Sequence, residues 1–600
     1  MRSWLLLTLL GLIQIALLDY RGAVCSCVCY EESRLASGLV QIYTGDFSTF
    51  RVNPPLPGMA AALPLACMDV GPADSYSKPG ERLIRQRHEY VAGRRFVEEH
   101  GEASMRYLRI ARLSCVVFAL AGTLLCYSWA RRCYGTYAGL LAAVLWAASP
   151  FVLGHGCLVG TDIPAAAMGL VALYCFWRWL KTPQWPEAMI AGIGLGLAEL
   201  CKFTLLVMCP LLPLLWLVYR LTDLQIMGRH DWLRQAAMLS LALLLSIYVV
   251  NCGYVFEDTF TPLERFRFQS MLLTGHRSLE DIPAEGANRF ADTWIGKLPV
   301  PFPANMVQGI DTQRFDFERG LRSYLRERWA DHGWWYYYGY ALAIKVPLGT
   351  WCLLAMAIGV TLLGRGYSAT WRDEMVVLAP GLAILIFVSS QTGFSIHSRY
   401  VVPALPFFFV WASKVGRVFE MQPCTRKRQV LAVVVVMALA WSVTSSLWVY
   451  PHSLSYFNEL VGGPKRGGEH LVDSNIDWGQ DLFYLKHWLH EHPEVKLDGL
   501  ACFGSYPVTL AGIPETPSPP QGPETIHARM NAAGGDIGPQ PGWYALSVNY
   551  LYGRTPQYRY FLQFEPAGSA GYSIYIYHVT PEAPNRVRRE SGMPEIPQSK

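Results

Sequence analysis

Three acidic residues of the sequence have the type and placement for proton-transfer chemistry. Glu31 and Glu32 are adjacent and follow the first apolar run, and Asp162 ends the segment "LGHGCLVGTD". A carboxylate near a membrane surface and other charges can have an altered proton affinity, and it can take the proton from an attacking hydroxyl. Glu31 and Glu32 could equally be solvated loop charges, and Asp162 could cap the helix that begins with Pro164.

Cations occur at the expected outer ends of other apolar segments. Lys202 lies in "LCKFT", Arg399 in "SIHSRYVVP" and Lys345, somewhat deeper, in "ALAIKVPLG". Ionisable groups near the apolar zone are expensive and often functional, and Lys or Arg there could bind a phosphate. Snorkelling at the interface is the alternative, above all for Lys202. Acids and cations that converge on one face indicate a site for a phosphate-bearing amphiphile.

The elements that must position these residues are membrane spans. The chain has 600 residues, of which 52% are hydrophobic and 16% charged. A span needs roughly 20 mostly apolar residues, so we expect an all-α polytopic bundle of about eleven transmembrane helices. The segments are 3–19, 107–129, 137–153, 163–180, 187–201, 203–219, 235–254, 340–363, 375–390, 400–416 and 429–449.

The distribution of basic residues predicts the orientation of this bundle. Lys and Arg cluster in alternate short loops, which places the N-terminus in the cytoplasm and the C-terminus outside. Three long segments then lie outside: 20–106, 256–333 and 450–600. The loop bias accounts for the net charge of +5, so we expect membrane lipids and no nucleic acid as partners. We read the first apolar run as an uncleaved span, with a signal peptide as the alternative.

We expect two structured parts and a tail. Residues 1–450 form the transmembrane domain, with surface helices in "ASGLVQIYTGDF" and "NPPLPGMAAALPLACMDV". Residues 451–580 form a small extracytoplasmic α/β domain, with a helix at 479–491 and strands in "GLACFGSY", "GWYALSVNYL" and "GYSIYIYHV". Residues 581–600 are expected to be a disordered tail.

Cys25, Cys27 and Cys29 form a C-x-C-x-C pattern on the expected outer side. Alternate spacing suits neither the usual C-x-x-C zinc pattern nor a local disulfide, so a structural role is favoured over a metal site.

The stretch "DSNIDWGQD" begins like a calcium-binding loop. Asp473, Asn475 and Asp477 alternate, but Trp478 occupies the position of the required Gly and Tyr484 that of the final Glu. Turns leading into the following helix are the favoured explanation, with a role in acceptor binding as the alternative.

Five stretches resemble a known family. "EESRLASGLVQIYTGDFSTFRVNPPLPG", "ASPFVLGHGCLVGTDIP", "LGLGLAELCKFT", "HSRYVVPALPF" and "YFNELVGGPKRGGEHLVDSNIDWGQDL" are similar to bacterial family 39 glycosyltransferases. That family is related to protein O-mannosyltransferases and to aminoarabinose transferases of lipid A. The resemblance is weakest at 70–100 and 515–540. It implies a GT-C fold, located in the inner (plasma) membrane, that moves a sugar from a polyprenyl-phosphate donor to a hydroxyl of a lipid, glycan or protein acceptor.

The resemblance also implies roles for residues. An Asp-Glu pair is usual in the first outer loop, and here it falls on Tyr30 and Glu31, so the base is assigned to Glu31 with Glu32 as the alternate. Tyr30 has a reference pKa near 10 and cannot supply a carboxylate charge. The resemblance allows a divalent cation, although the sequence shows no convincing cage for one. Asp162 is a second acid of the site, and the substrate-binding candidates are Asn53, Pro54, Pro55, Lys202, Lys345, Arg399 and Tyr400.

Two other classes of protein fit the sequence less well. A transporter or lipid flippase would carry charges throughout the thickness of the bundle, whereas these candidates lie at one rim. A GT-C protein without catalytic activity would follow if the Tyr at position 30 abolished the chemistry.

Overall fold

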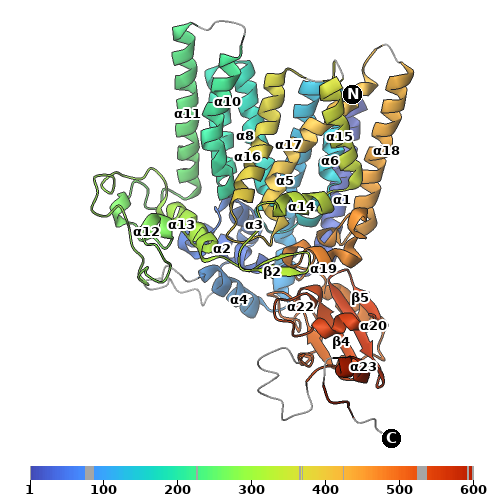
Figure 1. Ribbon diagram of the computed structural model, residues 1–600. Coiled ribbons are helices and arrows are strands. Elements are labelled where there is room, and N and C mark those ends of the chain that lie inside the picture. The colour runs from blue at the N-terminus through green and yellow to red at the C-terminus, as the bar shows by residue number, and fades with distance from the viewer. Residues whose placement is uncertain are drawn as a thin grey trace.

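The computed structural model describes residues 2–73, 87–223, 228–363, 366–367, 369–422, 425–522, 537–590 and 593–596. Long helices form a bundle, with the N-terminus at one end and a small lobe made by the C-terminal residues beyond the other end (Figure 1). The bundle consists of α1 (Arg2–Val24), α5 (Ala103–Tyr134), α6 (Thr136–Ala147), α8 (Asp162–Lys181), α9 (Trp185–Glu199), α10 (Met208–Leu221), α11 (Arg229–Gly253), α15 (Leu348–Leu363), α16 (Trp371–Ser390), α17 (Leu405–Ala412) and α18 (Arg426–Val449).

Each of the eleven predicted apolar segments falls on helical residues, but not all of them are full spans. Within the described residues, eight helical segments are long and apolar enough to cross a membrane, or nine if one bent pair counts as a single span. The difference from the expected number comes from α6 and α9, which have 12 and 15 residues and are short for a bilayer. The chain is an integral membrane protein.

The segment 340–363 is broken, where one straight span was expected. Helix α14 (Tyr337–Lys345) meets α15 at 111°. Pro347 lies at the break and favours extended backbone in the residue before it, and Val346 is indeed extended, with φ −103° and ψ 135°. Lys345 therefore ends α14 at a bend and does not lie within a continuous helix.

Small and aromatic residues pack the centre of the bundle. Trp146 on α6 is fully buried, and its Nε1 donates to the carbonyl of Ala119 on α5 at 2.8 Å. A side chain at Gly122 would collide with the Trp146 ring, so the glycine permits this close approach of α5 and α6. On α18, by contrast, Val433, Met437 and Trp441 are exposed, as expected for a helix that faces lipid.

A layer of shorter elements covers the end of the bundle away from the N-terminus (Figure 1). Helix α2 ends at Gly45, which is left-handed with φ 65° and donates its N–H to Gln41. Helices α2 and α3 confirm the two helices predicted in the first long loop. The elements of the layer are α2 (Glu31–Thr44), α3 (Leu56–Ala66), α4 (His88–His100), α7 (Pro150–His155), η2 (Phe203–Val207), α12 (Met271–Thr274), α13 (Ala304–Arg319), β1 (Ser323–Leu325), β2 (Arg328–Ala330) and η4 (Ser398–Ala404).

The C-terminal lobe contains a four-stranded sheet of order β3-β4-β6-β5, in which only β3 and β4 are parallel. The helix predicted at 479–491 corresponds to α20, and the three predicted strand segments contain β3, β4 and β6. Leu485 and Ile576 share one apolar cluster with Leu35 of α2 and Leu108 of α5, so the lobe is packed on the bundle. The elements are α19 (Gly467–His470), α20 (Leu482–Glu491), β3 (Gly499–Ala501), β4 (Gly542–Ser547), α22 (Val548–Leu551), β5 (Gly568–Ala570), β6 (Ile574–Val579) and α23 (Ala583–Glu590).

Helix α23 lies in the segment 581–600 that the sequence predicted to be disordered. Val587 is fully buried against the aromatic cluster of the sheet, and Arg588 donates to the carbonyl of Ile537 at 2.6 Å. One buried apolar residue and a satisfied arginine explain the order of this short helix. Residues 591–592 and 597–600 of the expected tail lie outside the described residues.

Candidate functional site

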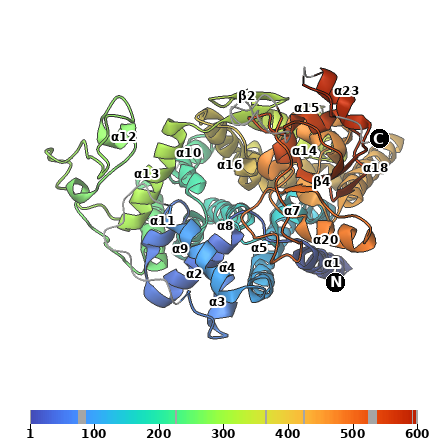
Figure 2. The same ribbon diagram turned by 90° about the horizontal axis from the view of Figure 1, so that it is seen from below.

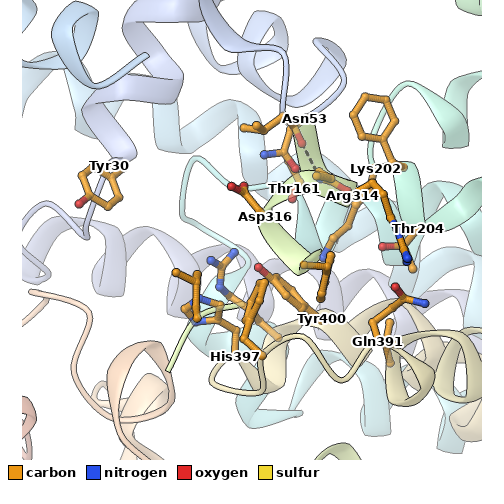
Figure 3. Close-up of a pocket in the computed structure, with 18 of the residues that line it drawn as sticks. Tyr30, Asn53, Thr161, Lys202, Thr204, Arg314, Asp316, Gln391, His397 and Tyr400 are labelled. Carbon is orange, nitrogen blue, oxygen red and sulfur yellow. Dashed lines mark hydrogen bonds between the residues drawn. The ribbon is translucent and has the colours of Figure 1, made fainter. Parts of the chain in front are cut away.

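A cavity of about 830 Å³ lies at the end of the bundle that carries the C-terminal lobe. Its walls come from α2, α13, η2, α16 and η4 and from the segment after α19. Seen from below, α2, α3, α4 and α13 lie on one side of the bundle and the lobe on the other (Figure 2). The close-up shows Tyr30 at one extreme of the lining and Thr204 and Gln391 at the other (Figure 3). The cavity thus joins segments that lie hundreds of residues apart in the chain.

Three cations gather around two aromatic rings in this cavity. The Cζ atoms of Arg34 and Arg399 lie 5.4 Å and 4.5 Å from the centroid of the Trp478 ring. Lys202 Nζ lies 5.0 Å from the centroid of Tyr400. Such contacts stabilise cations that are partly removed from water. The arrangement brings positive charge from α2, η4 and the residue before η2 into one place.

Asp162 forms ion pairs with two of these cations. Lys202 Nζ lies 2.6 Å from Asp162 Oδ1, and Arg399 Nη1 lies 3.4 Å from Oδ2. Asp162 is buried as the first residue of α8 and does not itself line the cavity. The predicted convergence of an acid and cations on one face is therefore present in the structure.

The cation group carries more positive than negative charge. Arg34, Lys202 and Arg399 are accompanied by the carboxylates of Asp162 and Asp473, which leaves one positive charge in excess. Burial and the neighbouring Arg399 lower the pKa of Arg34. Arg399 Nε is buried and has no hydrogen-bond partner among the described residues. A bound anion would satisfy this donor and balance the charge.

Glu31, the predicted base, lies outside the cavity. Its carboxylate is fully buried and accepts from Arg112 Nε at 2.9 Å and Nη2 at 2.6 Å. The backbone N–H groups of Val159 and Val28 donate to it at 3.0 Å and 3.3 Å. The buried guanidinium of Arg112 requires this counter-charge, so the side chain of Glu31 points towards α5 and away from the cavity lining.

Three more candidate residues lie away from the cavity. Glu32 is 4% exposed and accepts from Cys27 Sγ at 3.2 Å, and its burial raises its pKa. Pro54 and Pro55 are buried at the start of α3. These residues shape the first loop but do not line the cavity.

Lys345 also lies away from the cavity. It donates to the carbonyls of Leu454, at 2.8 Å, and Asn475 and lies over the Phe457 ring. The lysine thus connects the bend between α14 and α15 with the chain that leads into the lobe.

Tyr30 lines the cavity at the position where the resemblance expects an Asp. Its ring lies 4.3 Å from that of Tyr90, and its backbone is left-handed with φ 61°. This conformation is uncommon for a non-glycine residue. Tyr30 lines the cavity, whereas the next residue, Glu31, does not.

Three carboxylates line the cavity: Glu89, Asp316 and Asp473. Glu89 and Asp316 share one cation, because Arg87 Nε lies 2.6 Å from Glu89 and Arg87 Nη1 lies 3.0 Å from Asp316. Burial raises the pKa of both groups despite Arg87. Burial alone would also raise the pKa of Asp473, but His397 and the Ser474 N–H hold it below its ordinary value.

The structure brings together only part of the predicted site. Asn53, Lys202, Arg399 and Tyr400 line the cavity. The sequence reasoning missed Arg34, although it lies two residues after Glu32 in the quoted stretch "EESRLASGLVQIYTGDFSTFRVNPPLPG". It also missed His397, which lies two residues before Arg399 in the quoted segment "HSRY", and it gave no role to Asp316 or Trp478.

The fold brings no metal-binding cluster together among the residues that the structure describes. Within the parts of the chain that the structure describes, no group of three or more His, Cys, Asp or Glu side chains is placed to hold a metal ion. Cys25, Cys27 and Cys29 are buried and free, and Cys29 lines the cavity. The divalent cation that the resemblance allows stays an untested expectation.

Comparison with known families supports the expected relationship. Residues 106–251 match the model of the family described as dolichyl-phosphate-mannose-protein mannosyltransferase. The predicted resemblance is confirmed over this segment. It includes α8, with Asp162 at its start, and the residues around Lys202. No curated protein matches the chain.

Several solved structures are similar in arrangement. ArnT from Cupriavidus metallidurans bound to undecaprenyl phosphate is 12% identical, with 95% of this chain and 97% of that chain covered and a TM-score of 0.44. The Saccharomyces cerevisiae protein O-mannosyltransferase Pmt1-Pmt2 complex bound to the sugar donor is 11% identical, with 75% and 90% covered and a TM-score of 0.49. The Archaeoglobus fulgidus oligosaccharyltransferase in the apo form is 12% identical, with 91% and 70% covered and a TM-score of 0.45.

Proposed function

We propose that this protein is a membrane glycosyltransferase that moves a sugar from a polyprenyl-phosphate donor to an acceptor hydroxyl. The observation that carries this proposal is one cavity that joins a cation group with an excess positive charge to an apolar flank. The family match over residues 106–251 supports the same class of reaction.

The apolar flank fits the isoprenoid part of such a donor. Leu206, Val207 and Pro210 line the cavity from η2 and α10, and Phe387 and Val388 line it from α16. Further along the same two helices, Leu214 and Ile386 are 55% and 67% exposed, as expected for lipid-facing positions. An isoprenoid chain could therefore extend from the cavity into the bilayer between α10 and α16, while its phosphate stays at the polar end.

The cation group fits the phosphate and its change of charge during the reaction. A phosphodiester donor carries one negative charge, which matches the excess at Arg34, Lys202 and Arg399. When the bond to the sugar breaks, the released phosphate monoester carries about −1.5 to −2 at neutral pH. Cations that hold the growing charge more strongly than the initial one stabilise the transition state relative to the bound donor.

The rest of the polar lining supplies room for the sugar and the acceptor. Tyr30 and Tyr90 form an aromatic wall, and Asn53, Gln313 and Asp316 add hydrogen-bonding groups. The acceptor is proposed only as a hydroxyl compound, since lipid, glycan and protein acceptors share this chemistry. From the basic loops of the sequence, we propose that the site faces the extracytoplasmic side of the inner membrane.

A reconstituted transfer assay tests this function. The purified protein in lipid nanodiscs is mixed with polyprenyl-phosphate sugars and with lipid, glycan and peptide acceptors, and mass spectrometry follows free polyprenyl phosphate and glycosylated product together. We expect stoichiometric formation of both. Movement of labelled polyprenyl-phosphate sugar across sealed proteoliposomes with no product formed would instead support a flippase and overturn the proposal.

A further inference from the structure

We infer that Asp473 is the catalytic base of this site and that His397 positions it. The inference rests on the proposed glycosyl transfer and adds the group that takes the proton. The acceptor oxygen forms a bond to the anomeric carbon while the bond from that carbon to the phosphate oxygen breaks. The bonding electron pair leaves with the phosphate, the hydroxyl proton passes to Asp473, and Asp473 later releases it to water.

Elimination among the carboxylates leads to Asp473. Glu31 is fully buried against Arg112, and Glu32 is buried beside Cys27. Of the acids that line the cavity, Glu89 and Asp316 are both paired with the permanent charge of Arg87. Asp473 is the lining carboxylate whose adjacent partner is a histidine, with Oδ1 3.1 Å from His397 Nδ1.

One oxygen of Asp473 is held and the other is left for a ligand. Oδ1 accepts from the N–H of Ser474 and lies next to His397 Nδ1. Oδ2 has no hydrogen-bond partner among the described residues, and the side chain is 23% exposed in a residue that lines the cavity. His397 Nδ1 also lies 3.0 Å from Ser474 Oγ, which fixes the ring. An oriented carboxylate with one free oxygen can accept a proton from a hydroxyl in the cavity.

The backbone at Asp473 adopts a conformation that is rare for residues other than glycine. Its φ is 59°, in the left-handed region that costs a non-glycine residue of order 1 kcal/mol or more. Asn549 stabilises it from the C-terminal lobe: its Oδ1 accepts from the Asp473 N–H at 2.6 Å, and its Nδ2 donates to the Asp477 carbonyl at 2.9 Å. The lobe thus presents Asp473 to the cavity through a strained turn.

The position of Asp473 relative to the cation group suits this step. Asp473 and Arg399 both line the cavity, and the charge of Arg399 helps keep Asp473 ionised. A phosphate at the cation group would therefore place its sugar within the same polar end of the cavity. His397 and Asn549 would act through Asp473 as positioning residues.

Asp473→Asn and Asp473→Gly are the decisive variants. We expect Asp473→Asn to lower kcat at least 100-fold, in line with the usual contribution of a general base, while the Kd for polyprenyl phosphate changes less than threefold. Asp473→Gly keeps the left-handed turn without strain and leaves space for a small acid. We expect added sodium formate to restore part of its kcat, which a purely structural role of Asp473 would not allow.

The controls separate this inference from the proposed function. His397→Gln and Asn549→Ala should lower kcat about tenfold with KM nearly unchanged, whereas the exposed Asp331→Asn should behave like the wild type. Transfer by the wild type together with a kcat for Asp473→Asn within threefold of it would overturn the inference alone. If Asp473→Asn does not fold, Asp473→Gly becomes the deciding variant. A folded Asp473→Gly variant whose kcat is not restored by formate would then overturn the inference. A wild type that transfers no sugar would overturn the proposed function itself.

Discussion

Arg112 and Glu31 form a fully buried ion pair with two hydrogen bonds, 81 residues apart in the chain. Arg112 also donates to the carbonyls of Gly22, Cys25 and Ser26 at 2.8 to 2.9 Å. One guanidinium thus fastens the end of α1, the turn after it and the start of α2 to α5. The pair explains why a conspicuous acid in the first loop is a structural element of the fold.

We expect Glu31→Gln to destabilise the protein strongly. Removing one partner of a buried ion pair leaves an uncompensated charge and typically costs about 3 to 5 kcal/mol. The melting temperature in detergent should fall, and the kcat of the folded fraction should fall less than tenfold. Glu469→Gln, which breaks the exposed pair with Arg466, serves as the control and should leave the melting temperature unchanged. A stable Glu31→Gln variant without transfer would make Glu31 the base after all and contradict the assignment of Asp473.

Replacing Lys202 or Arg399 by Met should weaken the binding of polyprenyl phosphate. A hydrogen bond to a charged group contributes about 1.5 to 3 kcal/mol, which corresponds to roughly a 10- to 100-fold rise in Kd. Arg399→Lys should recover only part of the loss, because lysine lacks the planar guanidinium that lies over the Trp478 ring in the wild type. Titration calorimetry in nanodiscs measures the effect, and the exposed Lys427→Gln at the opposite end of the bundle is the matched control. Equal Kd values for all these variants would place the phosphate elsewhere.

The aromatic ring of Tyr30 should matter more than its hydroxyl. Tyr30→Phe keeps the contact with Tyr90 and should leave KM and kcat within twofold of the wild type. Tyr30→Ala loses an aromatic pair of about 0.5 to 1.5 kcal/mol, so we expect KM to rise about 2- to 10-fold. Steady-state kinetics measures both parameters. A large loss of kcat in Tyr30→Phe would give the hydroxyl a chemical role that its pKa, which burial raises above the ordinary value, does not favour.

Asp477 should make the stability of the protein depend on pH. Burial raises its pKa to about 7 from an ordinary value of 3.8. Between these values the folded state binds the proton and the unfolded state does not, so the free energy of unfolding falls as the pH rises from about 4 to about 7. Asp477→Asn resembles the protonated form and should flatten this part of the melting-temperature profile. Asp331→Asn, an exposed acid, should retain the slope, and an unchanged slope in Asp477→Asn would show that another group causes it.

Hydropathy and the alternation of basic loops were sufficient to predict the helices of the bundle and the end at which several site residues lie. All eleven apolar segments are helical, and the topology alone placed Asp162, Lys202 and Arg399 at one end, where the structure shows them in contact. The bend of 111° was missed because the apolar run at 340–363 is continuous in hydropathy, although Pro347 marks the break.

The direction of individual side chains was beyond sequence reasoning. Nothing in the spacing of the first loop shows that Glu31 meets Arg112, since the partner comes from another element. Asp473 could be recognised as a turn residue from the sequence. Its proposed role, however, depends on contacts with His397, the residue before η4, and with Asn549 of the lobe. Long-range contacts of this kind follow from packing and have no local pattern.

The hydrogen bonds of Asn549 to the turn at 473–477 also have an evolutionary consequence. A recombination event between relatives with its crossover between residues 477 and 549 would separate this asparagine from the turn that it stabilises. Chimeras that inherit both ends of the contact from a single parent should therefore retain activity more often than those whose crossover falls between them.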